Sequence, residues 1–201
     1  YYANADSLHD MGRESARLME KSRTQLAQLL SVDAQELLFT SCASESNNYA
    51  IKGYALANRH KGNHLITTRV EHSSVLNSFA QLEKEFGFRV SYLPVTRKGS
   101  VDLDALAQAL DKDTILVSTM LVNNETGAIN PMKDIAGLVH SKSRAVFHVD
   151  GVQALGKLEI DLADMDMATF SAHKIYGLKG SALLYRKANI QLLDLISGGQ
   201  Q

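Results

Sequence analysis

The chain has 201 residues, 45% of them hydrophobic, and a formal net charge of −1, which suits one domain with a full hydrophobic core. A charge this close to zero gives no basic field for nucleic acid or an anionic membrane surface, and no apolar run approaches the ~20 residues of a membrane span. The single cysteine, Cys42, excludes an internal disulfide framework and suits a reducing cytoplasm.

Amphipathic segments predict helices at regular intervals along the chain. Each has apolar residues at helical spacing, and several have the expected end signals, such as acidic residues in the first turn or a glycine at the close. The predicted helices cover residues 8–30, 44–58, 73–87, 102–111 and 132–142.

Short apolar runs lie between these segments and predict strands. They cover residues 36–40, 64–70, 88–95, 114–122, 145–150, 167–172 and 181–186. Apolar strands separated by helices indicate an α/β fold with a mainly parallel sheet and helices on both faces. The chain shows no internal repeat and no linker, so we expect one domain over residues 1–201.

Both ends of the chain predict that this domain belongs to a longer protein. The sequence opens on Tyr1-Tyr2 rather than on methionine, and it closes on the Gly-rich stretch SGGQQ at residues 197–201. We therefore expect truncation at both ends.

Polar residues follow the predicted strands, where ligands bind in sheets of this kind. Because the carboxyl ends of parallel strands share one rim, we expect these residues to line a single crevice. They are Ser41–Asn48, Glu71-His72, Asn123–Gly127, Asp150–Gln153 and Ser171–Lys174.

Taken one at a time, these residues also have plain structural interpretations. The Ser41–Ser44 turn could bind an anion through free helix-start amides, or its last serine could only cap the helix. Asp150 needs a partner if buried, or it could cap the next segment. His72 could be a satisfied polar residue, Asn123-Asn124 a simple turn and Lys174 a solvated surface residue.

Taken together, the residues suit pyridoxal phosphate. Helix-start amides would bind its phosphate, the carboxylate of Asp150 would pair with its protonated ring nitrogen, and Lys174 would bind its aldehyde as a Schiff base. We expect apolar neighbours around Lys174, which would make it a better nucleophile.

Six segments, in order, resemble one family along nearly the whole chain. The family is that of the cysteine desulfurases, within the class V aminotransferase group of fold-type I pyridoxal-phosphate enzymes. The segments are ANADSLHDMG (3–12) with the helix after it, LFTSCASESNNYAIKG (38–53), RVEHSSVL (69–76), VNNETGAINP (122–131), FHVDGVQALGKLEIDL (147–162) and SAHKIYGLKG (171–180).

The resemblance implies a role for each matching residue. Lys174 would bind the cofactor and move protons at the substrate α-carbon, and Asp150 would pair with the ring nitrogen. Gln153 would donate to the ring hydroxyl, His72 would stack on the ring and assist proton transfer, and Asn124 would lie near the ring hydroxyl and the substrate carboxylate. The phosphate would be held by the amide of Ala43 and the side chains of Ser44, Ser171 and His173.

The resemblance also implies an activity, the conversion of L-cysteine to L-alanine. The sulfur would pass as an enzyme persulfide to an acceptor protein in iron–sulfur or thiolation pathways, and the enzyme would be a homodimer. A selenocysteine lyase or another class V lyase would share this core, and a non-catalytic scaffold is the remote alternative.

Some positions depart from the family pattern. Cys42 stands where glycine is usual, Ser44 where threonine is usual, and Gly151-Val152 in place of an Ala-Thr or Ala-Ala pair. These changes preserve small size or a hydroxyl, and we expect Cys42 to serve only as a small residue. The family's small domain, its substrate-binding arginine and its nucleophilic cysteine loop are not found in this sequence, so we expect a cofactor-binding domain that does not complete sulfur transfer by itself.

Overall fold

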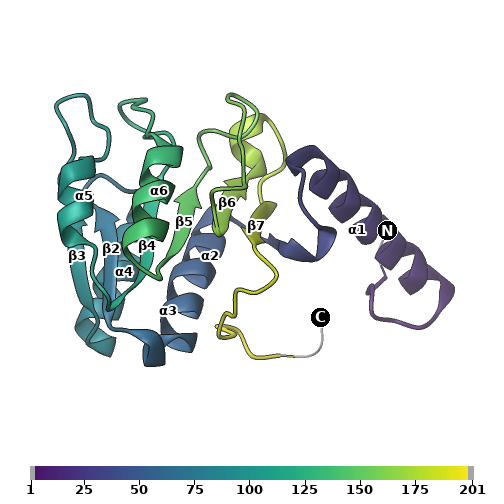
Figure 1. The fold of residues 1–201 in the computed structure, drawn as a ribbon. Helices are drawn as coiled ribbons and strands as arrows, with labels where there is room; N and C mark the ends of the chain where they lie inside the picture. Colours follow the sequence, from purple (N-terminus) through teal and green to yellow (C-terminus); the bar gives the residue numbers. More distant parts are fainter. Residues whose placement is uncertain (1–2, 199–201) are drawn as a thin grey trace.

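A seven-stranded sheet forms the centre of the computed structural model, which describes residues 3–198 (Figure 1). The strand order across the sheet is β1-β7-β6-β5-β4-β2-β3. All seven predicted strands are present, with bounds of β1 Leu37–Thr40, β2 His64–Thr68, β3 Arg89–Leu93, β4 Thr114–Met120, β5 Val146–Asp150, β6 Met167–Ser171 and β7 Ala182–Arg186.

The sheet is mainly parallel, which confirms the predicted fold class. Strands β3, β2, β4, β5 and β6 pair in parallel, whereas β7 runs antiparallel to both β6 and β1. The register places Met120 of β4 beside Asp150 of β5, and Asp150 beside Thr169 of β6. The carboxyl ends of the three central strands therefore lie level at one edge.

Helices cover both faces of the sheet and form two separate apolar clusters. One cluster joins the sheet to α5, α6 and the end of α1, and the other joins it to residues 49–53, α3 and α4. The predicted helices are confirmed, with bounds of α1 Asp10–Leu30, α2 Ala43–Asn48, α3 Tyr54–Ala57, α4 Ser73–Phe86, α5 Leu103–Ala109 and α6 Met132–Lys142.

Helix α1 projects from the side of the sheet (Figure 1). Its C-terminal end is anchored by buried Ala27 and Leu30, while Leu18, Met19 and Leu29 remain exposed. Within residues 3–198, no helix is both long and apolar enough to cross a membrane.

The segment predicted as one helix over residues 44–58 contains a π-helical turn at Tyr49–Gly53, between α2 and α3. The carbonyl of Gly53 accepts a hydrogen bond from the backbone amide of Leu193 at 2.9 Å. A Cβ on Gly53 would lie 3.1 Å from the carbonyl oxygen of Leu193. The glycine thus allows the C-terminal segment to pack against this turn, a contact that helical periodicity could not predict.

The expectation that a helix separates every pair of strands is wrong at the end of the chain. Residues 151–166, between β5 and β6, form turns, and a short 3-10 helix, η4 (Ala172–Ile175), joins β6 to the antiparallel β7. Parallel neighbours need a long crossover, which is usually but not always a helix, and residues 151–166 supply it between β5 and β6 without one. Because β7 is antiparallel to β6, it can follow through the short η4 connection. The predicted Gly-rich turn at 197–201 lies largely outside the described residues.

One buried histidine makes the stability of the fold sensitive to acid. His148 is fully buried in β5 and hydrogen-bonds to the hydroxyls of Ser118 (2.8 Å) and Thr169 (3.1 Å). Burial lowers the pKa of His148 to about 3. Unfolding releases the ring into water, where it binds a proton below about pH 6.5.

We therefore expect the free energy of unfolding to fall as pH drops from 6.5 towards 3, by up to about 1.4 kcal/mol per pH unit from this residue. His148→Gln, which cannot titrate, should flatten that slope even if it lowers stability at pH 7. Urea unfolding at several pH values measures the slope, with His60→Gln at an exposed site as control. An unchanged slope in His148→Gln would contradict the prediction.

Candidate functional site

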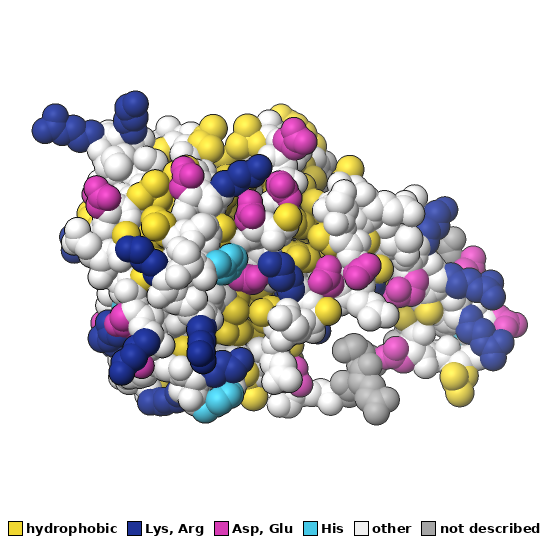
Figure 2. Space-filling view, in the orientation of Figure 1, with side chains coloured by type: hydrophobic (Ala, Val, Ile, Leu, Met, Phe, Trp, Pro, Cys, Tyr) yellow, Lys and Arg dark blue, Asp and Glu magenta, His cyan; other side chains and the backbone are white. Residues whose placement is uncertain are grey.

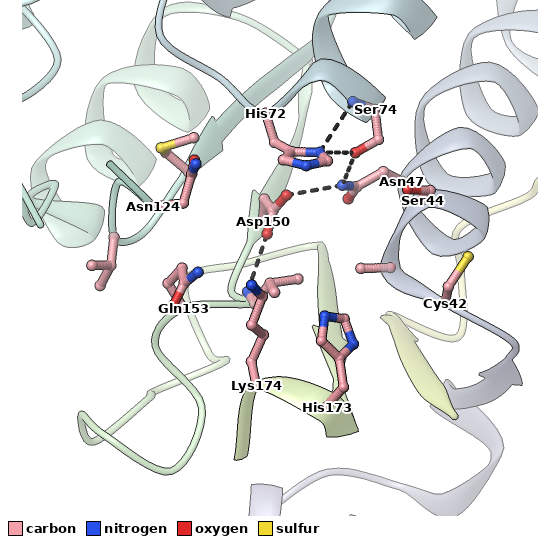
Figure 3. A pocket seen from close by; sticks show the side chains of 14 residues that line it. Cys42, Ser44, Asn47, His72, Ser74, Asn124, Asp150, Gln153, His173 and Lys174 are labelled. Atoms are coloured by element: carbon pink, nitrogen blue, oxygen red, sulfur yellow. Dashed lines mark hydrogen bonds between the residues drawn. The ribbon is translucent and has the colours of Figure 1, made fainter. Parts of the chain in front are cut away.

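A cavity of about 290 Å³ opens at the carboxyl ends of the central strands, beside the starts of α2 and α4 (Figure 3). This volume is at the lower end of small-molecule pockets, which span ~300–1,000 Å³. The lining residues are Cys42, Ala43, Ser44, Asn47, His72, Ser74, Met120, Val122, Asn124, Asp150, Val152, Gln153, His173 and Lys174.

This one pocket brings together eight of the nine residues singled out from the sequence. The ninth, Ser171, is buried at the end of β6 and hydrogen-bonds to Nδ1 of His173 at 2.7 Å. The rim formed by the strand ends therefore gathers polar groups into a single site. The eight that line the pocket are Ala43, Ser44, His72, Asn124, Asp150, Gln153, His173 and Lys174.

Asp150 ends β5 inside the pocket and is only 6% exposed. Its carboxylate accepts one hydrogen bond from Nδ2 of Asn47 (2.9 Å) and one from the amide of Val152 (3.1 Å). The second bond is the capping role predicted as the plain alternative, so Asp150 both caps the next turn and faces the pocket. Burial raises the pKa of Asp150, and the two hydrogen bonds offset part of that rise.

His72 combines its two predicted interpretations. Its Nδ1 accepts from the backbone amide of Ser74 at 3.1 Å and so caps α4, while the same ring lines the pocket. A cap of this kind fixes the ring relative to the helix axis.

Lys174 lies in η4 and points towards Asp150 and Gln153 (Figure 3). Lys174 itself is exposed, although the pocket that it lines also contains the apolar residues Met120, Val122 and Val152. The next residues, Ile175 and Tyr176, are exposed as well. The cause is the short connection to β7, which leaves this turn outside the helical layers.

The start of α2 offers backbone amides rather than a capping serine. Its N-cap is Cys42, which makes no side-chain capping bond, so the prediction that Ser44 caps this helix is wrong. The first amides of a helix have no partner within it and favour an anion. Cys42, Ala43 and Ser44 border the pocket at this point.

The two neighbouring asparagines have different places. Asn123 forms the predicted turn, because its Oδ1 accepts from the amides of Glu125 and Thr126, both at 2.9 Å. Asn124 is exposed and lines the pocket.

Gln153 presents an amide that is already oriented. Its carbonyl oxygen accepts from Nζ of Lys157 at 2.9 Å, which leaves the NH₂ group for the pocket. That orientation suits a hydrogen-bond donor.

Sequence reasoning missed Ser74 as a lining residue and gave no role to Asn47, although Asn47 lies in the predicted rim segment Ser41–Asn48. Asn47 lies one helical turn after Ala43, so the spacing i, i+4 could have placed both on one face of α2. Its contact with Asp150 joins residues 103 positions apart, and nothing in the local sequence indicates such a pairing.

The sheet and its polar rim are those of a fold-type I pyridoxal-phosphate enzyme. A solved structure described as a NifS-like protein superposes with a TM-score of 0.96 at 41% identity, over 100% of this chain and 56% of that one. The sequence profile of the aminotransferase class-V family matches residues 1–200, so the chain belongs to that family.

Individual relatives cover the same residues. A NifS/IcsS protein homolog from Lactobacillus delbrueckii subsp. bulgaricus is 48% identical across 100% of this chain and 52% of the relative. The cysteine desulfurase IscS of Clostridium botulinum is 43% identical across 100% of this chain and 50% of the relative. The chain thus spans about half the length of the curated relatives it matches.

Pyridoxal phosphate is the cofactor of this family, and the residues present fit it. Asp150 is a buried carboxylate whose partners among residues 3–198 are neutral donors, with no cation in ion-pair distance. Such a group is stabilised by a protonated ring nitrogen. Helix-start amides, His173 and a lysine amine lie around the same cavity.

A second buried carboxylate, Glu71, connects two of the chain segments that form the pocket. It is 5% exposed, and its Oε1 accepts from the hydroxyl of Thr68 (2.7 Å) and the amide of Met120 (3.0 Å). Burial raises the pKa of Glu71 to about 8, with a further contribution from the charge of Asp150. Glu71 thus joins the turn before His72 to the end of β4.

We expect Glu71→Gln to stabilise the protein at alkaline pH. The folded carboxyl holds its proton up to about pH 8 and the unfolded one only to about pH 4.5, so this residue loses stabilisation as pH rises through that interval. Glutamine preserves the acceptor oxygen and removes the charge.

The free energy of unfolding at pH 6 and pH 9 measures the effect. The stability of Glu71→Gln relative to the parent should be greater at pH 9 than at pH 6, because by pH 6 the parent has lost only part of the stabilisation that it loses between pH 4.5 and pH 8. Glu125→Gln, at an exposed position, is the matched control. A variant less stable than the parent at pH 9 would contradict the assignment.

Proposed function

We propose that this chain is the cofactor-binding large domain, over residues 1–201, of a pyridoxal-phosphate-dependent cysteine desulfurase. The observation that carries the proposal is the meeting of Lys174, Asp150 and His72 in one pocket, in a chain 43% identical to a cysteine desulfurase. The reaction would convert L-cysteine to L-alanine and pass the sulfur, as a persulfide, to an acceptor protein.

In this proposal each lining residue binds a defined part of the cofactor. Asp150 pairs with the ring nitrogen, because it is the buried carboxylate at the end of the pocket. Gln153 donates its free NH₂ group to the ring hydroxyl, and His72 stacks on the ring. The phosphate is held by the amide of Ala43 and by the side chains of Ser44, Ser171 and His173.

When bound, pyridoxal phosphate supplies an electron sink for negative charge at the substrate α-carbon. Lys174 would hold the cofactor aldehyde, and its amine would accept the proton from the substrate α-carbon. Its exposed side chain suits both tasks, since the amine must turn between cofactor and substrate. Asn124, on the opposite side of the pocket, orients the substrate carboxylate.

The remaining parts of the proposal concern the whole protein. The thiol that takes sulfur from L-cysteine, the arginine that binds the substrate carboxylate and the small domain would be supplied outside the residues present here. We further propose a homodimer and a cytoplasmic location, the latter supported by the single cysteine. The acceptor would be an iron–sulfur scaffold or a thiolation protein.

The first test is cofactor binding. Adding pyridoxal phosphate to the purified protein should give the visible absorbance band of a lysine-linked cofactor, and Lys174→Ala should abolish the band because no amine then meets the aldehyde. Lys179→Ala, in the same exposed turn, should retain it. A parent protein that binds no cofactor would exclude the enzyme and favour a scaffold.

The second test is turnover by the natural full-length protein. It should release alanine from L-cysteine, and Asp150→Asn should lower kcat by about 10²-fold or more, since the carboxylate stabilises charge in the transition state. Asp113→Asn, an exposed residue away from the pocket, should leave kcat unchanged. Release from L-selenocysteine alone would instead identify a selenocysteine lyase.

A further inference from the structure

A line of four hydrogen-bonded side chains crosses the pocket between two residues of the proposed function, Asp150 and His72 (Figure 3). Nδ2 of Asn47 lies 2.9 Å from Oδ2 of Asp150 and 2.9 Å from Oγ of Ser74. Oγ of Ser74 lies 2.8 Å from Nδ1 of His72. The four residues come from α2, α4 and the end of β5, so the line joins three elements.

The carboxylate sets the direction of the hydrogen bonds. An ionised carboxylate only accepts, so the NH₂ group of Asn47, and not its oxygen, must face Asp150. The second hydrogen of that NH₂ group goes to Ser74. The carbonyl oxygen of Asn47 is buried and has no partner among the described residues, so the two donated bonds are what orient this fully buried side chain.

The same reasoning assigns the donor and the acceptor between Ser74 and the His72 imidazole. The hydroxyl of Ser74 accepts from Asn47, so its own hydrogen is free to be donated to Nδ1 of His72. The backbone amide of Ser74 donates to the same nitrogen at 3.1 Å. Nδ1 therefore carries no hydrogen, and the neutral ring has its proton on Nε2.

We propose that Asn47 and Ser74 are positioning residues that hold the Asp150 carboxylate in one rotation and link it to the His72 imidazole. Asn47 donates to both Asp150 and Ser74, so it fixes the carboxylate directly. Ser74 in turn hydrogen-bonds to the His72 ring and fixes its orientation relative to the carboxylate. This inference rests on the proposed function, because that function is what makes the pocket a cofactor site. The hydrogen bonds themselves do not require a cofactor.

The network also determines which hydrogen-bonding group the His72 ring presents to a ligand. With Nδ1 occupied by two donors, the neutral ring has no free lone pair and presents an N–H at Nε2. His72 is then a hydrogen-bond donor, and Lys174 is the residue left in the pocket to accept a proton.

The first readout is the tautomer of His72. Nitrogen NMR of the histidine-labelled chain at pH 8, without cofactor, should show an unprotonated Nδ1 and a protonated Nε2, with the signal assigned by its loss in His72→Gln. Both Ser74→Ala and Asn47→Leu should move the Nδ1 signal, and Ser74→Thr should restore it. A ring protonated on Nδ1 in the parent would overturn the proposed direction.

The second readout is the titration of Asp150, followed by carboxyl carbon NMR of the same chain. Asn47→Leu keeps a similar volume and removes the donor, so the Asp150 midpoint should rise by about one to two pH units, the effect of losing one hydrogen bond to a charged group. The other titratable residues near this carboxylate, His72, Glu71 and Lys174, are all still present in that variant, and any change at His72 is followed by the first readout.

Asn48→Ala is the matched control, because among residues 3–198 the side chain of this adjacent asparagine hydrogen-bonds only within its own helix, to the carbonyl of Ser44 at 2.8 Å. It should leave the Asp150 midpoint and the His72 signals unchanged. Equal shifts in Asn47→Leu and Asn48→Ala would mean that both variants act by disturbing α2 in general. That result would overturn the proposal. Because neither readout uses pyridoxal phosphate, failure here is distinct from failure of cofactor binding.

Discussion

The buried carboxylate of Asp150 is the constraint on which the rest of the site depends. Strand β5 is buried along its whole length, between β4 and β6, so a charged residue at its end must be satisfied inside the protein. Its partners in residues 3–198 are two neutral donors, which stabilise the charge without cancelling it. This is the physical reason that the pocket favours a cationic ring nitrogen.

The segment from α2 to α3 contributes two features to the pocket. Its first turn presents backbone amides to an anion, and Asn47, one turn later, donates to Asp150. The π-helical turn follows at once, and Gly53 there lets the C-terminal segment pack closely. Such turns are common at functional sites because they change which side chains face a pocket. The helix-start amides and the donor to Asp150 thus come from one continuous helical segment.

Lys174 and Asp150 are held in place in different ways. The carboxylate is immobilised by a strand and two hydrogen bonds, whereas the lysine lies in a short exposed turn between antiparallel strands. The charge partner of a cofactor has to remain in place through a reaction, while a group that both binds and transfers a proton has to turn. In the proposed function, this contrast suits a fixed partner for the ring nitrogen and a lysine that turns.

One group of basic side chains lies at the end of the sheet away from the pocket. Figure 2 shows Lys and Arg side chains gathered on the lower left of the face in view, over the ends of the strands opposite the pocket. Groups lining a groove there include Lys61, Lys112, Lys142 and Arg144. The polar rim of the pocket is instead mixed in charge, which suits a ligand with both an anionic and a cationic end.

The sequence by itself determined the seven strands, the main helices and the rim where eight candidate residues meet. These follow from hydrophobic periodicity and from the rule that parallel strands share one edge. Only the tertiary structure decided that Asn47 pairs with Asp150 and that Lys174 is exposed. Each of these depends on contacts between distant segments or on how a turn lies outside the helical layers, and neither is encoded in local spacing.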